Sequence, residues 1–544
     1  MKSKYLIGIV VLAFILRFFM LGQNPPSLNW DETSIGYNAY SILKTGKDEY
    51  GTSFPIEFRS FDDYKPPVYI YLDVLPVAIF GLTEFAVRFP SALFGFLSVI
   101  VMFYLVKKLF DKEDHKLGLI VALFSAFFLS ISPWHLQFSR AAYEGNVGLF
   151  FLLLAFYLFI KGLESRWYLV LSSISFVICL YSYHSFRLVV PIFLLVLISL
   201  FIKKLLVYKK QLIISALIIF IFSLPIYIGF LNPEGSKARL SMVSIFGESE
   251  GLQNQLAQLQ NDKSTGNVIG QVFHNRRFYY LYTAEKNYLT HFDFNYLFTI
   301  GAGSLHHHAK DMGMMYLFEL PLLIWGLISV FKNPSKKIIA MLALLIIAPL
   351  PAAVTTGTPH GVRAIGMVPG LIFLVANGAA SLYGIINKIK KANYRAIAIS
   401  FGFLIFAINF TYYLNQYYSV TPREVGYFWQ YGNKEVIIAA HGLEDNYDRV
   451  IMTYIYDQPY IYYLFYNKID PSWYQKNWDT NGNGQVDRFS RKIGKYEFRN
   501  INFISDEKLP KTLLIGTEQE IPVAAPLREI RFPDGRIAYR IVGN

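Results

Sequence analysis

Two adjacent carboxyl groups and a lysine lie in one polar stretch near the start of an otherwise apolar chain. Asp31 and Glu32 follow Asn29-Trp30, and Lys65 comes later in the same stretch, directly before two prolines. A carboxylate can accept the proton of an attacking hydroxyl group, and a cation can stabilise negative charge on a departing phosphate. These residue types therefore favour group transfer from a phosphate-linked donor.

Further polar side chains stand close to the ends of apolar segments, where they could join the same site. We take Asp31, Glu32 and Glu144 as catalytic candidates and Lys65, Arg88, Arg140, Arg187 and Arg363 as ligands of the donor phosphate. The candidates that would support the substrate site are Asp62, Asp63, Tyr64, Tyr69, Tyr143, His184 and His360.

Each of these residues also has a purely structural interpretation. Asp31 and Glu32 fit a helix N-cap with an acid in its first turn, and Lys65 fits a snorkelling side chain before a stiff turn. A single arginine fits an anchor at the membrane interface. Independent anchors should occur on both faces of a membrane, so the side on which the group lies distinguishes the two interpretations.

The elements that position these residues are predicted to be membrane helices. The 544 residues are 54% hydrophobic and 16% charged, whereas soluble domains have roughly 25% charged residues. A single soluble core cannot bury so much apolar surface, so soluble enzymes and disordered scaffolds are excluded. The one cysteine, Cys179, leaves no intrachain disulfide and no cysteine cluster for a metal.

The apolar runs predict eleven transmembrane helices with the N-terminus inside. The first lacks a small-residue cleavage site and is interrupted by Arg17, so we interpret it as uncleaved. The segment Val68 to Phe80 would reach only ~20 Å as a helix, too short for ~30 Å of hydrocarbon, and is predicted to lie on the outer surface. The predicted spans are 5–21, 86–106, 117–134, 147–161, 167–183, 187–202, 211–231, 314–331, 338–354, 364–386 and 396–414.

The net charge of +13 is explained by orientation in the membrane. With this order of spans, every basic cluster between them lies in the cytoplasm, as the positive-inside rule requires. Counting Val68 to Phe80 as a span would reverse the loop Lys107 to Lys116. Nucleic acid is therefore not needed as a partner, and the catalytic and phosphate-binding candidates all lie on the outer face.

The predicted organisation has two domains. Residues 1–414 form a transmembrane catalytic domain with outer loops 22–85 and 232–312. Residues 415–544 form an extracytoplasmic α/β domain, with short β-prone runs such as Val450 to Tyr456. The chain has no convincing P-loop or Rossmann fingerprint, which agrees with a lipid-borne donor in place of a soluble nucleotide. It also has no internal repeat of the transporter kind.

At these residues the sequence resembles the polytopic GT-C glycosyltransferases that use polyprenyl-phosphate sugars, in particular the protein O-mannosyltransferases and the lipid A aminoarabinose transferases. The resemblance is specific over about residues 10 to 165. It rests on Arg17, Asp31-Glu32, Lys65-Pro66-Pro67-Val68-Tyr69, the segment from Glu84 through Arg88 to Leu93, and Ser139-Arg140 to Glu144.

The resemblance implies roles for individual residues. Asp31 would be the general base or would orient the acceptor hydroxyl, with Glu32 assisting it. Lys65 would contact the donor phosphate, and Arg88 would hold either the loop or the phosphate. Glu144 stands near a second aspartate of many relatives, although its type and spacing differ. The reaction would invert the anomeric carbon and would require no cofactor.

Two segments raise the question of a metal. His306-His307-His308 could bind a transition metal, although consecutive histidines point in different directions. Oxygen ligands at Asp479, Asn481, Asn483 and Asp487 resemble a calcium loop, but Ser490 occupies the position of its bidentate glutamate. A plain Asn/Gly turn is the alternative.

The sequence thus predicts a multi-pass plasma-membrane enzyme that transfers a hexose or pentose from a polyprenyl-phosphate carrier to an extracytoplasmic hydroxyl. The acceptor is a protein or a glycolipid. A transporter or flippase of an anionic polyprenyl-linked lipid is the alternative, because the same arginines would bind such a lipid without catalysis. A third interpretation is a receptor-like anchor for the C-terminal tail, residues 415–544. It would leave the charges of the first outer loop unexplained.

Overall fold

The computed structural model forms two compact units, which are described separately. The first comprises residues 1–16, 95–137 and 145–413, and the second comprises residues 17–94, 138–144 and 414–544. The structure describes residues 2–61, 63–110, 115–229, 243–332, 334–479, 490–523 and 525–544.

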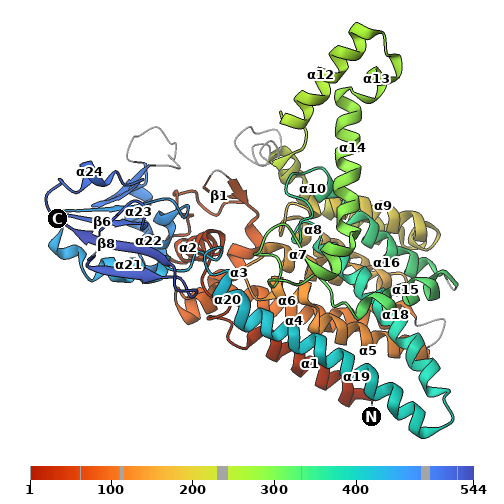
Figure 1. Ribbon diagram of the computed structural model, residues 1–544. Coiled ribbons are helices and arrows are strands. Elements are labelled where there is room, and N and C mark those ends of the chain that lie inside the picture. The colour runs from red at the N-terminus through yellow and green to blue at the C-terminus, as the bar shows by residue number, and fades with distance from the viewer. Residues whose placement is uncertain are drawn as a thin grey trace. The chain divides into compact units, whose positions relative to one another are not determined.

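The first unit is helical, because its long apolar runs carry few helix-breaking residues (Figure 1). The helices with most or all of their residues in it are α1 Lys2–Phe18, α4 Glu84–Leu109, α5 His115–Ile131, α6 Pro133–Ser139, α7 Glu144–Gly162, α8 Trp167–Leu180, α9 Phe186–Leu205, η1 Leu206–Tyr208, α10 Lys209–Gly229, α12 Glu250–Thr265, α13 Val268–Phe273, α14 Arg276–Leu289, η2 Thr290–Phe292, η3 Asn295–Thr299, α15 Glu319–Lys332, α16 Lys336–Ile347, α17 Leu350–Ala353, η4 Ile365–Met367, α18 Val368–Asn387 and α19 Ala392–Asn415.

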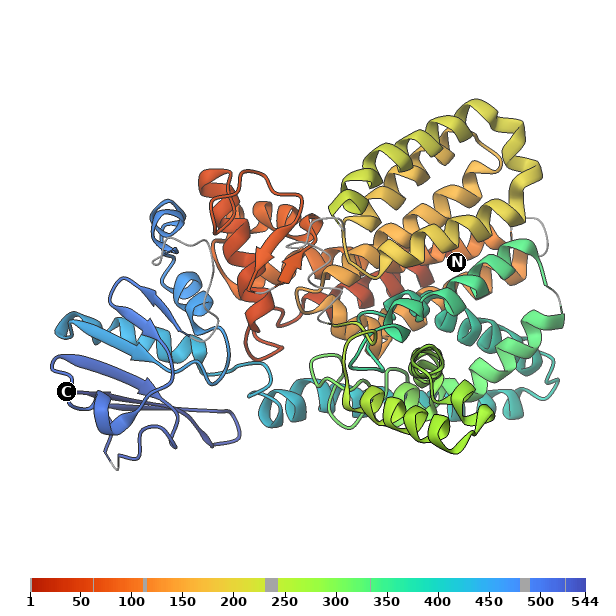
Figure 2. The same ribbon diagram turned by 90° about the horizontal axis from the view of Figure 1, so that it is seen from above.

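Helix α18 packs against both α15 and α5, and α10 packs against α8 (Figure 2). Glycines make the α15–α18 contact close. A β-carbon on Gly326 would lie 1.8 Å from the Leu374 carbonyl oxygen, and one on Gly378 would lie 1.9 Å from that of Leu322. Small residues of this kind let membrane helices approach through their backbones.

A multi-pass membrane protein is confirmed, but the number of spans stays a prediction. Each of the eleven predicted spans overlaps a helix. Within the described residues, six helices are long and apolar enough to cross a membrane, or seven if the bent pair α5 and α6 is one span. The continuous segment Phe186–Gly229 counts as one of these six, although it contains both α9 and α10.

The second unit begins with α2 Trp30–Thr45, the hairpin of β1 Phe58–Ser60 and β2 Asp63–Lys65, and α3 Pro67–Phe80. The segment expected to lie as a short helix on the outer surface is therefore helical. Helix α2 packs against α3 and also against α22 Pro459–Tyr466 and α23 Pro471–Asn477 from the far end of the sequence. The unit's remaining helices are η5 Gln416–Val420, α20 Thr421–Glu424, α21 Asn433–His441, η6 Glu444–Asn446 and α24 Phe503–Asp506.

The tail contains the predicted α/β domain, built on a mixed sheet. Its strand order is β4-β5-β3-β6-β8-β7, with β3 parallel to β5 and β6 and the other pairs antiparallel. Buried Ile451, Leu514 and Val542 form part of its core. The strands are β3 Arg449–Met452, β4 Arg491–Ile493, β5 Tyr496–Phe498, β6 Thr512–Gly516, β7 Arg528–Arg531 and β8 Ile537–Gly543.

Candidate active site

The N-terminus of α2 holds the paired acids in a fixed geometry. The Asn29 side chain accepts a hydrogen bond from the Glu32 backbone N–H at 2.9 Å, and the Glu32 carboxylate accepts one from the Asn29 N–H at 3.2 Å. This reciprocal capping box satisfies helix donors that would otherwise lack partners. Asp31 consequently occupies the second helical position, where the helix dipole favours a negative charge.

Asp31 and Lys65 form an ion pair between α2 and strand β2. The Asp31 side chain is 51% exposed, whereas that of Lys65 is only 8% exposed. The hairpin pairs Lys65 with Phe58. The arrangement presents an accessible carboxylate beside a nearly buried ammonium group.

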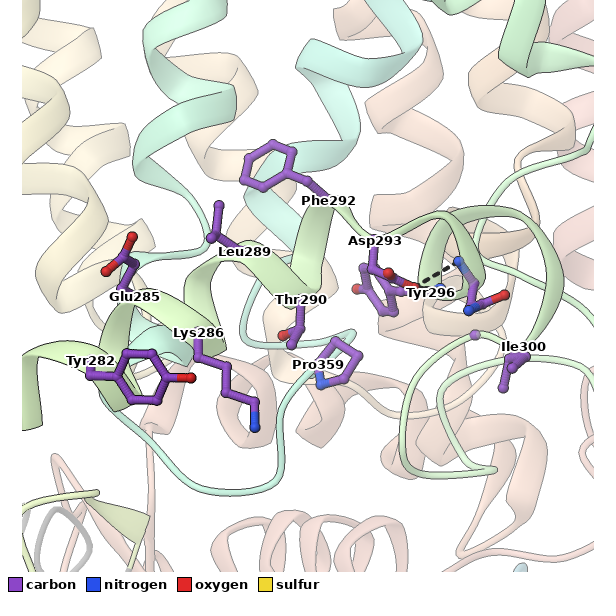
Figure 3. Close-up of a pocket in the computed structure, with 12 residues that line it drawn as sticks. Tyr282, Glu285, Lys286, Leu289, Thr290, Phe292, Asp293, Tyr296, Ile300 and Pro359 are labelled. Carbon is purple, nitrogen blue, oxygen red and sulfur yellow. Dashed lines mark hydrogen bonds between the residues drawn. The ribbon is translucent and has the colours of Figure 1, made fainter. Parts of the chain in front are cut away.

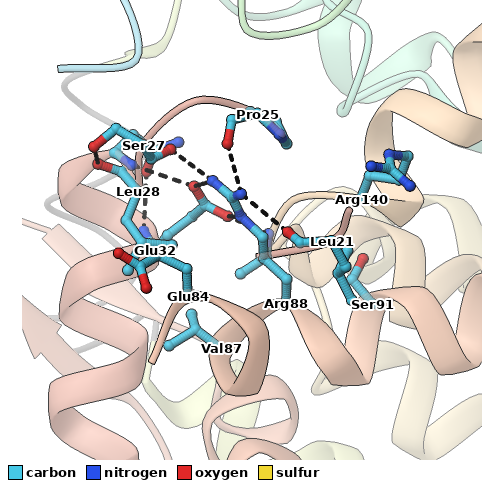
Figure 4. Close-up of polar contacts among 12 residues, drawn as sticks. Leu21, Pro25, Ser27, Leu28, Glu32, Glu84, Val87, Arg88, Ser91 and Arg140 are labelled. Atoms are coloured by element: carbon cyan, nitrogen blue, oxygen red, sulfur yellow. Dashed lines mark hydrogen bonds and ion pairs between the residues drawn. The ribbon is translucent and has the colours of Figure 1, made fainter. Parts of the chain in front are cut away.

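Glu32 is paired with Arg88 instead, and both side chains are buried (Figure 4). The guanidinium Nε donates to one carboxylate oxygen at 2.9 Å and Nη2 to the other at 3.1 Å. The remaining Arg88 contacts go to the carbonyl oxygens of Leu21, Pro25 and Ser27. Arg88 therefore holds the loop before α2, the first of the two roles that the family resemblance implied.

Arg140 has a similar structural position. Its Nη1 and Nη2 atoms donate to the carbonyl oxygens of Arg17 and Asn24 at 3.2 and 3.1 Å, and its Nε donates to the Tyr417 hydroxyl. The guanidinium also lies 5.3 Å from the centre of the Tyr417 ring, within cation–π range. Arg140 thus connects the end of α1 to the beginning of the tail.

The segment between α6 and α7 completes the group in the second unit. The Ala142 backbone N–H donates to Glu32 at 2.9 Å. Glu144 begins α7 and is within electrostatic reach of both Lys65 and Asp31. The structure therefore brings Asp31, Lys65 and Glu144 close to one another.

The remaining candidates in this unit have supporting positions. The Tyr69 hydroxyl is buried, donates to the Val87 carbonyl at 2.9 Å and accepts from the Ser91 N–H, so it joins α3 to α4. Tyr143 packs edge-on against Phe138. Asp63 and Tyr64 lie in β2, whereas Asp62 lies outside the described residues.

Four predicted site residues belong to the first unit. His184 precedes α9, in whose first turn Arg187 is buried. Arg363 donates through Nη1 to the Thr355 hydroxyl at 2.8 Å. His360 donates its backbone N–H to Nε2 of His291, whose pKa is lowered to about 4 by burial, so this imidazole is a neutral acceptor.

The structure lends no support to a metal at the histidine run. Across the described ranges, no three His, Cys, Asp or Glu side chains are arranged to hold a metal ion, and His306-His307-His308 is no exception. Of the calcium candidates, Asp479 is described, whereas Asn481, Asn483 and Asp487 lie outside the described residues.

Residues of the tail support α2 in ways that sequence analysis did not predict. The Gln430 side-chain oxygen accepts from the Trp30 backbone N–H at 2.9 Å and from the Tyr462 hydroxyl at 2.9 Å. The Tyr462 hydroxyl also lies 3.2 Å from the Leu28 carbonyl oxygen. Trp30 and Gln430 are 400 positions apart in the chain, and no spacing rule connects them.

Comparisons with known proteins agree with this architecture. Residues 64–228 match the family model described as dolichyl-phosphate-mannose-protein mannosyltransferase. No curated protein gives a significant sequence match. The apo crystal structure of ArnT from Cupriavidus metallidurans aligns over 99% of this chain and 98% of its own, with 12% identity and a TM-score of 0.55. The same values hold for ArnT bound to undecaprenyl phosphate.

A more distant structure is the oligosaccharyltransferase of Archaeoglobus fulgidus in complex with Zn and sulfate. It covers 76% of this chain and 52% of its own, with 17% identity and a TM-score of 0.45. The ArnT fold and the family-model match, whose range includes Lys65, Arg88 and Glu144, confirm the resemblance to the GT-C group. The chain therefore has the ArnT fold, and its residues 64–228 match a mannosyltransferase family model.

Proposed function

We propose that the protein transfers a sugar from a polyprenyl-phosphate carrier to a hydroxyl group of a protein or glycolipid on the extracytoplasmic face. The observation that carries this proposal is the accessible Asp31 carboxylate paired with the nearly buried Lys65. The ArnT structure with bound undecaprenyl phosphate supports the class of donor. A lipid-borne donor also suits a protein whose helices are long and apolar enough to cross a membrane.

The pair provides the two functions that the reaction needs. Asp31 accepts the proton of the acceptor hydroxyl as its oxygen attacks the anomeric carbon. The bond from this carbon to the phosphate oxygen breaks, and the leaving phosphate retains the electron pair. Lys65 stabilises the negative charge that develops there. Attack opposite the leaving group inverts the anomeric configuration.

The other charged residues maintain this geometry. Glu32 caps α2 and binds Arg88, so the position of Asp31 depends on both. Glu144, at the start of α7, provides a second carboxylate near Lys65 that would orient the acceptor or a sugar hydroxyl. The proposed chemistry requires no metal, because Lys65 supplies the positive charge at the phosphate.

Replacing Asp31 with Asn tests the proposal, because Asn has almost the same shape and cannot act as a base. We expect Asp31→Asn to abolish transfer from undecaprenyl-phosphate hexoses and pentoses in nanodiscs, measured by mass spectrometry of the products. The matched control is Asp445→Asn, at an exposed position of the tail. Both variants should show a cooperative melting transition, and that of Asp31→Asn should lie somewhat lower because the ion pair with the nearly buried Lys65 is lost.

Two results would contradict the proposal. Unchanged turnover of Asp31→Asn would exclude this residue as the base. Movement of intact lipid across sealed vesicles, without cleavage of the sugar–phosphate bond, would instead indicate a flippase.

A further inference from the structure

A cavity of the first unit lies beside α14. Its volume is about 750 Å³, and it lies between the end of α14, the short helices η2 and η3, and Pro359. Figure 3 shows Tyr282 and Lys286 extending from α14 near Thr290 and Pro359, with Asp293 and Tyr296 further along. This volume is within the usual range for small-molecule sites, roughly 300 to 1,000 Å³.

Polar groups line this cavity without being used by the fold. The side chains of Glu285 and Lys286 form no hydrogen bond or ion pair with the described part of the chain, and the Tyr282 hydroxyl forms none either. Tyr296 is 2% exposed, and its hydroxyl is buried with no hydrogen-bond partner. Tyr282, Glu285 and Lys286 are exposed, so their polar groups are available to a ligand in the cavity.

The charges of the cavity argue against a phosphate ligand. Glu285 and Asp293 contribute two negative charges and Lys286 one positive charge, so the lining residues carry an excess of one negative charge. The Asp293 carboxylate also accepts the Asn295 N–H at 2.8 Å, which keeps it in place beside η3. An anionic headgroup would be repelled here, in contrast to its attraction to Lys65.

The remaining lining suits a sugar. The aromatic and aliphatic side chains of Tyr282, Leu289, Phe292 and Tyr296 offer apolar surface to the C–H groups of a pyranose ring. Carboxylate, ammonium, phenol and amide groups on the same wall accept from and donate to its hydroxyls. A hydroxyl-rich, uncharged ring uses both sets of groups.

We infer that this cavity binds an uncharged saccharide unit of the acceptor, so that the acceptor is itself a glycan. The inference rests on the proposed transfer reaction, because the saccharide is taken to be part of the substrate that accepts the new sugar in that reaction. The proposed function assigns the donor phosphate to Lys65.

Saturation-transfer NMR on the full-length protein in detergent tests binding directly. The probes are methyl α-mannopyranoside and methyl β-arabinopyranoside. We expect transfer to the ring protons of at least one glycoside in the wild type, and a loss of at least fivefold in Tyr282→Ala and in Glu285→Gln. The matched control, Glu250→Gln on exposed α12, should retain the wild-type signal.

The outcomes separate the possible ligands. Equal signals in the wild type and both cavity variants would overturn the inference, as would absence of signal for both glycosides. Displacement of the glycoside by farnesyl phosphate would overturn it in favour of a donor site, and displacement by a serine-containing peptide would favour a protein acceptor.

Kinetics distinguish this inference from the proposed function. With a glycolipid acceptor, Glu285→Gln should raise the acceptor KM about tenfold while kcat and the donor KM stay within twofold of wild type. Asp31→Asn should abolish transfer and retain the NMR signal. If the wild-type protein transferred sugar but gave no glycoside signal, saccharide binding in the cavity would be refuted and the proposed transfer reaction would stand. Continued transfer by Asp31→Asn would refute the assigned base and leave the cavity unaffected.

Discussion

At the scale of single residues, the two neighbouring acids of α2 have different tasks. Glu32 is buried, forms half of the capping box and binds Arg88 through both oxygens. Asp31 is half-exposed and contacts Lys65. A carboxylate committed to a buried guanidinium cannot act as a base without breaking that pair, which costs several kcal/mol. The accessible acid is therefore the better base, and Glu32 is a positioning residue.

Lys65 provides the first prediction at this scale. Lys65→Met retains much of the stem and removes the charge, so kcat should fall by about 10²- to 10³-fold, the loss expected for one group that stabilises a developing negative charge. Lys65→Arg should retain part of the activity. The control is Lys476→Met, at an exposed position of α23. An unchanged kcat for Lys65→Met, measured at saturating donor, would rule out the assigned role.

Glu49 provides a second prediction. Burial raises the pKa of its carboxyl group to about 7, although the positive charge of Arg491 acts to lower it. One of its oxygens accepts from the Asn38 amide at 3.1 Å, and the other is buried without a partner. From about pH 4.5 to pH 7 the unfolded chain loses this proton while the folded chain keeps it. The free energy of unfolding should therefore fall by roughly 3 kcal/mol over that window as pH rises.

Glu49→Gln tests this linkage. Melting temperatures in detergent at about pH 5 and pH 8 should differ less in Glu49→Gln than in the wild type, and the variant should be the more stable of the two at pH 8. Glu507→Gln, at an exposed position of the tail, should retain the wild-type difference. If Glu49→Gln kept the full pH dependence, another group would be responsible.

At the scale of elements, α2 depends on close packing at Gly36. A β-carbon there would lie 2.5 Å from a Val87 methyl carbon and 2.7 Å from the Phe465 ring. Gly36→Ala should therefore destabilise the protein by about 1 to 3 kcal/mol through overpacking. It should also reduce transfer, because α2 carries Asp31.

The matched control for this prediction is Gly402→Ala in α19. A β-carbon at Gly402 meets no atom within 4 Å, so alanine should be neutral or slightly stabilising in the helix. Thermal melting of the two variants distinguishes packing from helix propensity. Equal melting temperatures would show that Val87 and Phe465 move aside without cost.

The same element shows how far the sequence alone was informative. The structural interpretation of Asp31 and Glu32 as an N-cap and a first-turn acid located the start of a helix, but the N-cap is Asn29, and both acids lie in the first turn of α2. The bond from Trp30 to Gln430 and the packing of Gly36 on Phe465 were not predictable, because the partners are separated by most of the chain. Local patterns predicted the helix, and long-range packing determines where it is held.

At the scale of the whole molecule, span length does not determine topology. Helices α8 and α15 were predicted to cross the membrane and α3 to lie on its surface, yet each has 14 residues. A straight crossing takes about 20 apolar residues, so helix length does not distinguish the two predicted spans from the predicted surface helix. The distribution of lysine and arginine distinguishes them, because placing α3 across the membrane would put Lys116 outside.

Cysteine labelling tests this orientation. The native Cys179 is buried and its thiol contacts the Gly148 carbonyl at 3.3 Å, so it should contribute little background. Ser472→Cys in α23 should react with a membrane-impermeant maleimide in intact cells. Lys116→Cys and Lys390→Cys should react only after permeabilisation. All three positions are exposed, so the substitutions remove no buried side chain.

Each contrary pattern identifies a different error in the topology. If Lys116→Cys were labelled from outside and the N-terminus stayed inside, α3 would cross the membrane, and the Asp31–Lys65 pair, which precedes α3, would keep its side. If all three variants required permeabilisation, α19, the predicted span between Lys390 and the tail, would not cross the membrane. Because a polyprenyl-phosphate sugar must meet its acceptor on the side where Asp31 is exposed, the labelling also determines from which compartment that acceptor comes.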